Sequence, residues 1–300
     1  MKVMITGATG LVGTELVKAL MQEGHELVVL SSNASRAQKQ FPQAQCVSWQ
    51  QLDDELELLA QLNGVIHLAG ENIEAKRWSE SQKKKIYHSR IHNTQKLVKA
   101  LQQAKPRALE AFISTSAIGI YGDRQDEVLN EDSHIGDKNL FLTQVCVDWE
   151  KQALQMQSLC RVCVLRVGIV LSRKGGALAK MLPAFQMAAG AVLGDGRQQM
   201  SWIHIQDLVR LYLTCLKDSQ YKGVFNATAP EPVNNREFSQ ALAKSLARPL
   251  IFTAPSWLLK LALGEMSQIL LQGQKVLPQR AMELGFRFNY PQLELALKDL

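Results

Sequence analysis

The sequence of 300 residues predicts an α/β fold, in which a doubly wound parallel sheet is followed by a smaller, mainly helical C-terminal lobe. Three observations support this prediction. Short apolar segments alternate with helical patterns, a glycine-rich turn follows the first apolar segment, and the alternation loosens after about residue 170. Apolar strands separated by helices form parallel βαβ units with right-handed crossovers. Ligands of such sheets bind at the carboxyl ends of the strands.

The first half of the chain supplies six expected strands, each built on a short apolar run. They are residues 3–6, 26–30, 46–49, 64–70 including an exit turn, 111–115 and 162–167. Helical patterns at 10–24, 52–62, 79–104 and 141–157 separate them. In the first of these helices, Val12, Leu16 and Leu20 lie on one face, and Gly24 supplies the stop.

The second half of the chain begins with glycine-rich loops. A helix is expected at 205–216, with Asp207 in its first turn, where a carboxylate complements the helix dipole. From Pro230 the pattern is mainly helical. The expected division is a large domain of residues 1–170, which residues 199–228 rejoin, and a substrate lobe of residues 171–198 and 229–300.

Composition favours a globular protein in the cytoplasm. The chain carries a net charge of +6, but its Lys and Arg residues are scattered, so no nucleic-acid surface is expected. No uninterrupted apolar stretch reaches membrane-spanning length, and the N-terminus lacks a signal-peptide pattern. Five scattered cysteines argue against a disulfide framework. His88 and His92 have metal-ligand spacing, but no third ligand is close in sequence, so no metal site is expected.

Residues 3–13 read VMITGATGLVG, which places three glycines between a strand and an amphipathic helix. This is the context of the dinucleotide fingerprint. Gly7 permits the tight turn, Gly10 lets the backbone approach a pyrophosphate, and Gly13 lets the helix lie close to the sheet. Free N–H groups at the start of a helix bind phosphates. The motif predicts a Rossmann-type NAD(P) domain, with the cofactor contacted by Gly7, Thr9, Gly10, Leu11, Val12 and Gly13.

The end of the second strand bears on the choice of cofactor. NAD enzymes usually place an acidic residue there to bind the ribose hydroxyls. Residues 27–36 read LVVLSSNASR and contain no acid. Ser31 and Ser32 could hydrogen-bond a 2′-phosphate, and Arg36 could reach it. We therefore expect NADPH to be preferred over NADH, with NAD(H) left open.

The glycine motif and four further segments resemble the short-chain dehydrogenase/reductase superfamily, in its extended, sugar-nucleotide-epimerase-like branch. The four segments are HLAGEN (67–72), FISTSAIGIYGD (112–123), LRVGIVL (165–171) and SWIHIQD (201–207). The resemblance implies that Leu68, Ala69 and Gly70 cover the adenine side of the cofactor. It also implies that Val167 and Val170 lie beside the nicotinamide. Ser116 takes the place of the catalytic serine.

A narrower resemblance covers essentially the whole chain. AGENI, the pair Arg77-Trp78, SRIHNTQ (89–95) and the tail 273–297 look like one atypical "epimerase family" subgroup, with its own C-terminal domain. Within SRIHNTQ, the resemblance makes Arg90 a phosphate-binding candidate, and a solvated helix arginine is the alternative.

The superfamily's Tyr-x-x-x-Lys pair, which moves protons during reduction, is missing. The residues four places after the five tyrosines are Ile91, Gln125, Leu216, Phe225 and Glu294. The helix that should carry the pair has Phe141 or Leu142 at the tyrosine place, and Val145 or Cys146 at the lysine place. A hydrocarbon side chain cannot transfer a proton. Among the possible substitutes, only Ser116 is expected to face a ligand; Tyr121 and Cys146 are expected to be packed residues.

Two functions remain open from the sequence. The first is an NADP(H)-linked oxidoreductase or epimerase-like enzyme with a small, polar substrate of unknown identity. The alternative is a non-catalytic NADPH-binding sensor or regulatory protein. His204 could face the substrate or be structural. No nucleic-acid or membrane partner is expected, and a homodimer is left open.

Overall fold

A seven-stranded parallel sheet forms the centre of the computed structural model, which describes all 300 residues. Its strands are β1 (Lys2–Thr6), β2 (Glu26–Ser31), β3 (Gln45–Ser48), β4 (Gly64–His67), β5 (Ala111–Ala117), β7 (Arg161–Val167) and β12 (Gly223–Ala227). Their order is β12-β7-β5-β4-β1-β2-β3, and all neighbours are parallel. The chain runs outward from β1 through β2 and β3, then returns to the other side of β1 at β4. This confirms the predicted fold class and puts a switch point between β1 and β4, where such sheets bind ligands.

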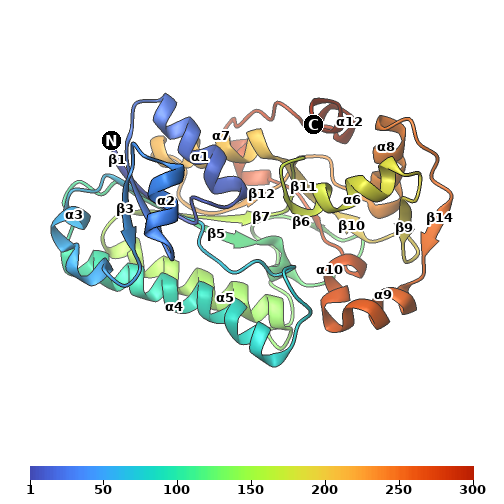
Figure 1. Ribbon diagram of the computed structural model, residues 1–300, viewed down its shortest axis with the longest axis horizontal. Helices are drawn as coiled ribbons and strands as arrows, with labels where there is room; N and C mark the ends of the chain where they lie inside the picture. The colour runs from blue at the N-terminus through green and yellow to red at the C-terminus, as the bar shows by residue number, and fades with distance from the viewer.

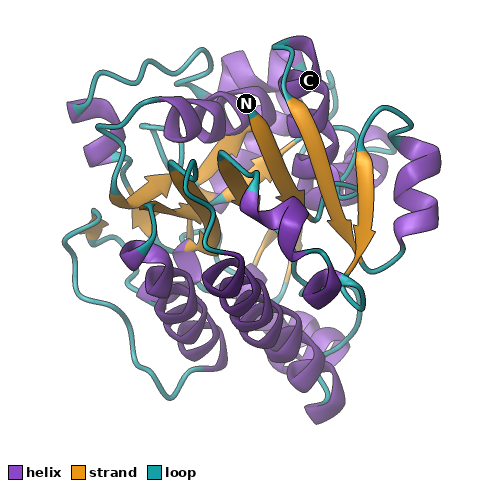
Figure 2. Ribbon diagram, turned by 90° about the vertical axis from the view of Figure 1, so that its left-hand side faces the viewer, coloured by secondary structure: helices purple, strands orange, loops and turns teal.

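Helices cover both faces of the sheet (Figures 1 and 2). One face carries α1 (Leu11–Gln22), α2 (Ala34–Gln40) and α7 (Ile205–Lys217); the other carries α3 (Leu56–Ala60), α4 (Glu80–Ala104) and α5 (Phe141–Ala153). Successive strand residues feed the two layers alternately. Val3 and Ile5 pack with α1 and α7, whereas Met4 packs with α3 and α4. Because both faces of the sheet are buried, the strands read as continuous apolar runs.

The rest of the chain builds a lobe beside the strand ends, on the right of Figure 1. Its helices are α6 (Gly176–Gln186), α8 (Asn235–Ser245), α9 (Ser256–Leu263), α10 (Gln268–Leu271) and α12 (Leu293–Asp299), whereas α11 (Gln279–Glu283) packs against β12 of the main sheet. Short strands join them: β6 (Val128–Leu129), β8 (Ile169–Leu171), β9 (Ala191–Leu193), β10 (Gln199–Met200), β11 (Trp202–His204), β13 (Val233–Asn234), β14 (Phe252–Ala254) and β15 (Lys275–Val276). The pairing of β15 with β6 brings the C-terminal tail next to the end of β5. No helix combines the length and apolar character needed to cross a membrane.

Several element boundaries differ from the sequence-based expectation. The single helix expected at 52–62 is a 3-10 turn (Leu52–Asp54) followed by the short α3. Helix α2 was not expected, since seven residues are too few to show a helical period. It begins where the Asn33 side chain accepts a hydrogen bond from the Arg36 N–H.

Candidate functional site

The turn after β1 is built so tightly that only glycine fits at its two ends. Gly7 has a φ of +69°, and a Cβ there would lie 3.0 Å from the carbonyl carbon of Leu68. A Cβ on Gly13 would lie 2.2 Å from the Gly7 carbonyl oxygen and 2.7 Å from the Ala8 Cα. The missing side chains therefore let α1 sit directly on the turn, and let the turn after β4 approach it.

The start of α1 is an open anion site. No side chain caps it, and its first turn carries no acidic residue. The first helical hydrogen bond runs from the Thr14 N–H to the Gly10 carbonyl, 2.9 Å away. The N–H groups of the residues before Thr14 and the positive end of the helix dipole are therefore available to a phosphate.

A groove, which we call the groove from here on, runs from this turn across the ends of β1 and β2. It is lined by Gly7, Thr9, Gly10, Leu30, Ser31, Ser32, Trp49, Leu68, Ala69, Gly70, Glu71, Ser89 and Asn93. Eight of the fourteen residues predicted to hold the cofactor are in this set. Ser31 Oγ accepts a hydrogen bond from the Asn33 N–H at 3.1 Å, so its own proton is free to bind a ligand. Arg36 is exposed and has no ion-pair partner.

A buried chain of hydrogen bonds fixes the far wall of the groove. Thr6 Oγ1 accepts the N–H groups of Leu68 (3.1 Å) and Ala69 (3.0 Å), so its own hydroxyl proton points to His67 Nδ1, 2.8 Å away. His67 Nε2 then carries the proton and donates to Thr94 at 2.8 Å. Burial lowers the pKa of His67 to about 3, which keeps the ring neutral. The turn of residues 68–70 is thus held in place by a network that does not titrate near neutral pH.

Arg90 supports the same wall from α4. Its guanidinium donates to the carbonyls of Glu71 (3.0 Å) and Ile86 (3.3 Å), and lies 5.2 Å from the ring of Trp149. It does not line the groove. Arg90 is therefore not a solvated helix arginine: Nη1 binds two backbone carbonyls, and the side chain packs beneath the turn at Glu71. Its role in binding a phosphate stays a prediction.

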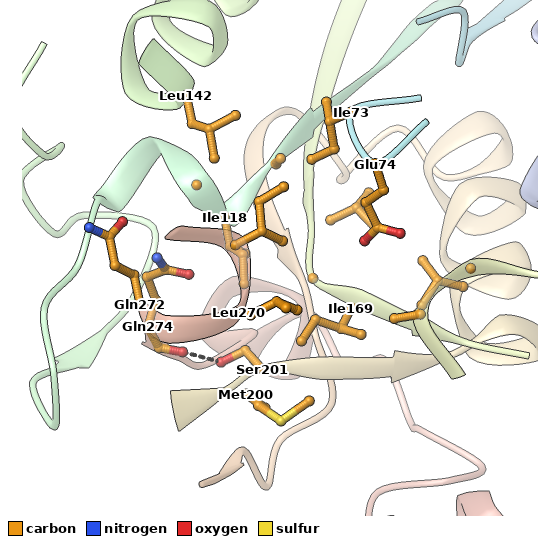
Figure 3. Close-up of a pocket in the computed structure, with 18 of the residues that line it drawn as sticks. Ile73, Glu74, Ile118, Leu142, Ile169, Met200, Ser201, Leu270, Gln272 and Gln274 are labelled. Atoms are coloured by element: carbon orange, nitrogen blue, oxygen red, sulfur yellow. Dashed lines mark hydrogen bonds between the residues drawn. The ribbon is translucent and has the colours of Figure 1, made fainter. Parts of the chain in front are cut away.

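A second hollow, which we call the cavity, lies on the other side of the start of α1 and has a volume of about 410 Å³. Four more of the predicted cofactor residues, Leu11, Val12, Val167 and Val170, contribute to its wall. Figure 3 shows the rest of the wall, with Ile118 and Leu270 near the centre and Gln272 and Gln274 on one side. Of the fourteen predicted cofactor residues, only Gly13 and Arg90 line neither hollow.

Helix α5 presents Leu142 and Cys146 to the cavity. Phe141 instead packs on Trp78, with ring centres 5.3 Å apart, and Val145 is buried against Ile91 and Trp149. Of the residues that the sequence offered for the tyrosine and lysine places, Leu142 and Cys146 are the ones that line the cavity. Burial, reinforced by Glu150, raises the pKa of Cys146 to about 12, so the thiol stays protonated at neutral pH.

Ser116 is turned away from the cavity, which corrects the expectation that it faces a ligand. Its neighbour Ala117 lines the cavity, and successive residues of a strand point to opposite faces. Ser116 is 1% exposed, and its hydroxyl donates to Glu150 Oε1 at 2.7 Å. Glu150 in turn receives two bonds of 2.9 Å from Arg166. Tyr121, which also bonds Arg166, is fully buried as expected.

Some residues that line the two hollows were not predicted from the sequence. Trp49, Ser89 and Asn93 line the groove, and the four-residue spacing of Ser89 and Asn93 on α4 was a usable signal. Gln272 and Gln274 gave no local signal, because β15 brings them to the cavity from far along the chain. His204 is buried against Tyr290 with ring centres 3.9 Å apart, which is the structural role left open above.

The switch-point sheet, the glycine turn and the groove across it define a Rossmann-type protein of the short-chain dehydrogenase kind. The chain belongs to the NAD dependent epimerase/dehydratase family, which matches residues 3–227, while residues 254–300 match a domain of unknown function, DUF1731. This confirms the subgroup resemblance.

Named relatives span the whole chain. It is 42% identical to "Epimerase family protein SDR39U1 homolog, chloroplastic" of Arabidopsis thaliana, over 100% of this chain and 86% of that one. The crystal structure of human epimerase family protein SDR39U1 with NADPH has a TM-score of 0.90 and 33% identity, covering 100% of this chain and 98% of that one. A protein titled nucleoside-diphosphate sugar epimerase from Corynebacterium glutamicum has a TM-score of 0.77 and 32% identity, over 99% of this chain and 57% of that one.

Proposed function

We propose that this chain binds NADP(H) along the groove and uses it for hydride transfer to a substrate in the cavity. The carrying observation is that the two hollows adjoin at the uncapped start of α1, where Gly10 lines the groove and Leu11 lines the cavity. The phosphates would lie on the α1 N–H groups, and the 2′-phosphate near Ser31, Ser32 and Arg36. A relative of the same length, human SDR39U1, was crystallised with NADPH. Bound NADPH supplies the hydride; the protein must bind, orient and polarise the substrate.

The cavity would polarise its substrate without a side chain that donates a proton at neutral pH. Leu142 cannot donate a proton, and the Cys146 thiol is too weakly acidic to exchange one at neutral pH. Glu74 Oε2 is paired with Lys180 Nζ at 2.7 Å. Gln272 and Gln274 line one side of the cavity, and their carboxamides have no partner within the protein (Figure 3). Amide N–H groups stabilise a developing oxyanion, so these two residues would hold the substrate oxygen, and water would supply the proton.

The second candidate is a non-catalytic NADPH-binding regulator. Leu142 and Cys146 favour it, because they leave α5 without the proton-transfer pair of the superfamily. Residency in the cytoplasm, assembly as a homodimer, and the division into a cofactor domain and a substrate lobe stay predictions under either candidate.

Hydride transfer separates the two candidates. We expect the protein, incubated with deuterium-labelled NADPH and a metabolite extract, to place deuterium in at least one compound. The measurement is mass spectrometry of the extract, with protein-free and unlabelled samples as controls. An extract that gains no deuterium, from protein shown to bind NADPH, would leave the regulator as the function.

Ser32→Asp is expected to weaken NADPH binding at least tenfold, while NADH binding is unchanged or tighter. A carboxylate at the end of β2 repels a 2′-phosphate and accepts hydrogen bonds from ribose hydroxyls. The affinities are measured by quenching of tryptophan emission, to which Trp49 in the groove contributes. Ser158→Asp is the matched control, since Ser158 is exposed and outside the groove. Equal losses in the two variants would contradict the placement of the 2′-phosphate.

A further inference from the structure

The cavity carries almost no charge. Its 26 lining residues include no Lys, Arg or His, and Glu74, the one acid, is paired with Lys180. Proteins hold diphosphates with Arg and Lys side chains or with free backbone N–H groups. No side chain in this wall can neutralise the two charges of a nucleoside diphosphate.

The helices that begin at the cavity place no cationic side chain there. Helices α5 and α10 contribute Leu142, Ile269 and Leu270, which have hydrocarbon side chains. The first turn of α8 is closed by a capping box between Asn234 and Glu237. At the start of α6, Cβ atoms built on Gly175 and Gly176 would lie 3.4 and 3.3 Å from the Leu11 side chain. The Leu11 side chain therefore packs against the glycine pair at the start of α6, which has no side-chain cap. The start of α1 belongs to the cofactor under the proposed function.

The wall is mostly apolar, and its polar groups are mostly occupied. Fifteen of the 26 lining residues are hydrophobic. Gln198 Nε2 donates to the carbonyls of Leu193 (3.0 Å) and Leu270 (2.9 Å), and Asn235 Oδ1 accepts from the Leu193 N–H at 2.8 Å. Ser201 Oγ donates to the Gln274 carbonyl at 2.7 Å. These groups hold the protein together and leave little for a ligand.

Two free carboxamides remain, and the backbone places them firmly. Gln272 and Gln274 flank Gly273, where a Cβ would lie 2.3 Å from the Gln199 nitrogen. The Gly273 carbonyl accepts the Arg124 N–H at 3.3 Å, and its N–H donates to Asp123 at 3.3 Å. Figure 3 shows Gln272 and Gln274 next to one another on one side of the cavity.

We infer that the cavity takes an uncharged, largely apolar compound with one carbonyl or hydroxyl group, and not a nucleoside diphosphate sugar. Its apolar body would lie on Ile118, Ile169 and Leu270, and its oxygen on Gln272 and Gln274. The inference rests on the proposed function, which assigns the α1 helix start to the cofactor. It replaces the sequence-based expectation of a polar substrate.

The test uses Prodan, an uncharged fluorescent ketone, on protein loaded with NADP⁺. We expect a saturable blue shift of Prodan emission that UDP-glucose does not reverse. Leu270→Gln should weaken Prodan binding about tenfold, since it removes apolar contact area. Leu261→Gln, the same change on a 70% exposed leucine of the same lobe, should leave it unaltered. The double variant Gln272→Leu/Gln274→Leu should also bind Prodan more weakly, although it is more apolar.

Either of two results overturns the inference: UDP-glucose displacing Prodan, or Prodan binding that responds to Leu261→Gln and not to Leu270→Gln. Tighter Prodan binding by the double glutamine variant would remove the role of the carboxamides. A prior NADPH titration of the same preparation separates failure of the proposed function from failure of the inferred substrate class. Failure to bind NADPH overturns the proposed function, and normal NADPH binding with displacement by UDP-glucose overturns only the substrate class.

Discussion

Gly13→Ala is expected to lower NADPH affinity at least a hundredfold and to destabilise the fold by about 2–3 kcal/mol. The added Cβ would lie 2.2 Å from the Gly7 carbonyl oxygen and 2.7 Å from the Ala8 Cα. Both neighbours are backbone atoms of a tight turn, so no side-chain rotation relieves the clash. Helix α1 must move away from the turn, which displaces the N–H groups proposed to hold the pyrophosphate.

Binding would be followed by tryptophan quenching and stability by urea unfolding. Gly24→Ala is the control, because Gly24 has a φ of +77° and open space around its Cβ position. An alanine there is strained by its backbone conformation, at about 1 kcal/mol, but lies at the opposite end of α1. We expect Gly24→Ala to lose stability and keep NADPH affinity. Wild-type affinity in a folded Gly13→Ala protein would show that the helix start does not hold the phosphates.

The glycine turn was predictable because its chemistry is local. A strand, three glycines and an amphipathic helix within twenty residues leave few conformations open, and the apolar runs determined the sheet in the same way. Which residues of β5 point to which face of the sheet was not predictable. Both faces of that strand are buried, so its sequence does not reveal that Ala117 faces the cavity and Ser116 the packing layer behind it.

Other features depended on contacts between distant segments. Whether Arg90 is solvated depends on the turn at Glu71, which packs over it from another element. Gln272 and Gln274 reach the cavity only because β15 pairs with β6, about 150 residues earlier in the chain. The alternation of strands and helices contains no information on such pairings between two-residue strands.

Glu150→Gln is expected to lower the free energy of unfolding by about 3–5 kcal/mol. Glu150 and Arg166 have side chains that are each 8% exposed, and two bonds of 2.9 Å join them. Burial alone would lower the pKa of Arg166, but the bonds to Glu150 and Tyr121 outweigh it and raise that pKa. Removing the carboxylate charge leaves the guanidinium buried without a counter-ion, and such a charge costs far more than the pair contributes.

An exposed pair of the same type supplies the control. Arg124 and Glu127 are also joined by two bonds, of 2.7 and 2.5 Å, but their side chains are 26% and 52% exposed. Glu127→Gln should therefore change stability by less than about 1 kcal/mol. The apolar double variant Glu150→Leu/Arg166→Met should recover part of the loss, because it leaves no unpaired charge. Equal effects of Glu150→Gln and Glu127→Gln in urea unfolding would contradict a structural role for the buried pair.

The buried pair of Glu150 and Arg166 also determines the role of Ser116. Ser116 and Arg166 are paired across β5 and β7, and the next residues along each strand, Ala117 and Val167, line the cavity. Ser116→Ala removes one hydrogen bond to Glu150 and should cost about 1–2 kcal/mol, with NADPH affinity and hydride transfer unchanged. A serine that touched the substrate would show the reverse, an intact fold with lost turnover. Unfolding and deuterium transfer measured on this one variant therefore separate packing behind the cavity wall from chemistry within it.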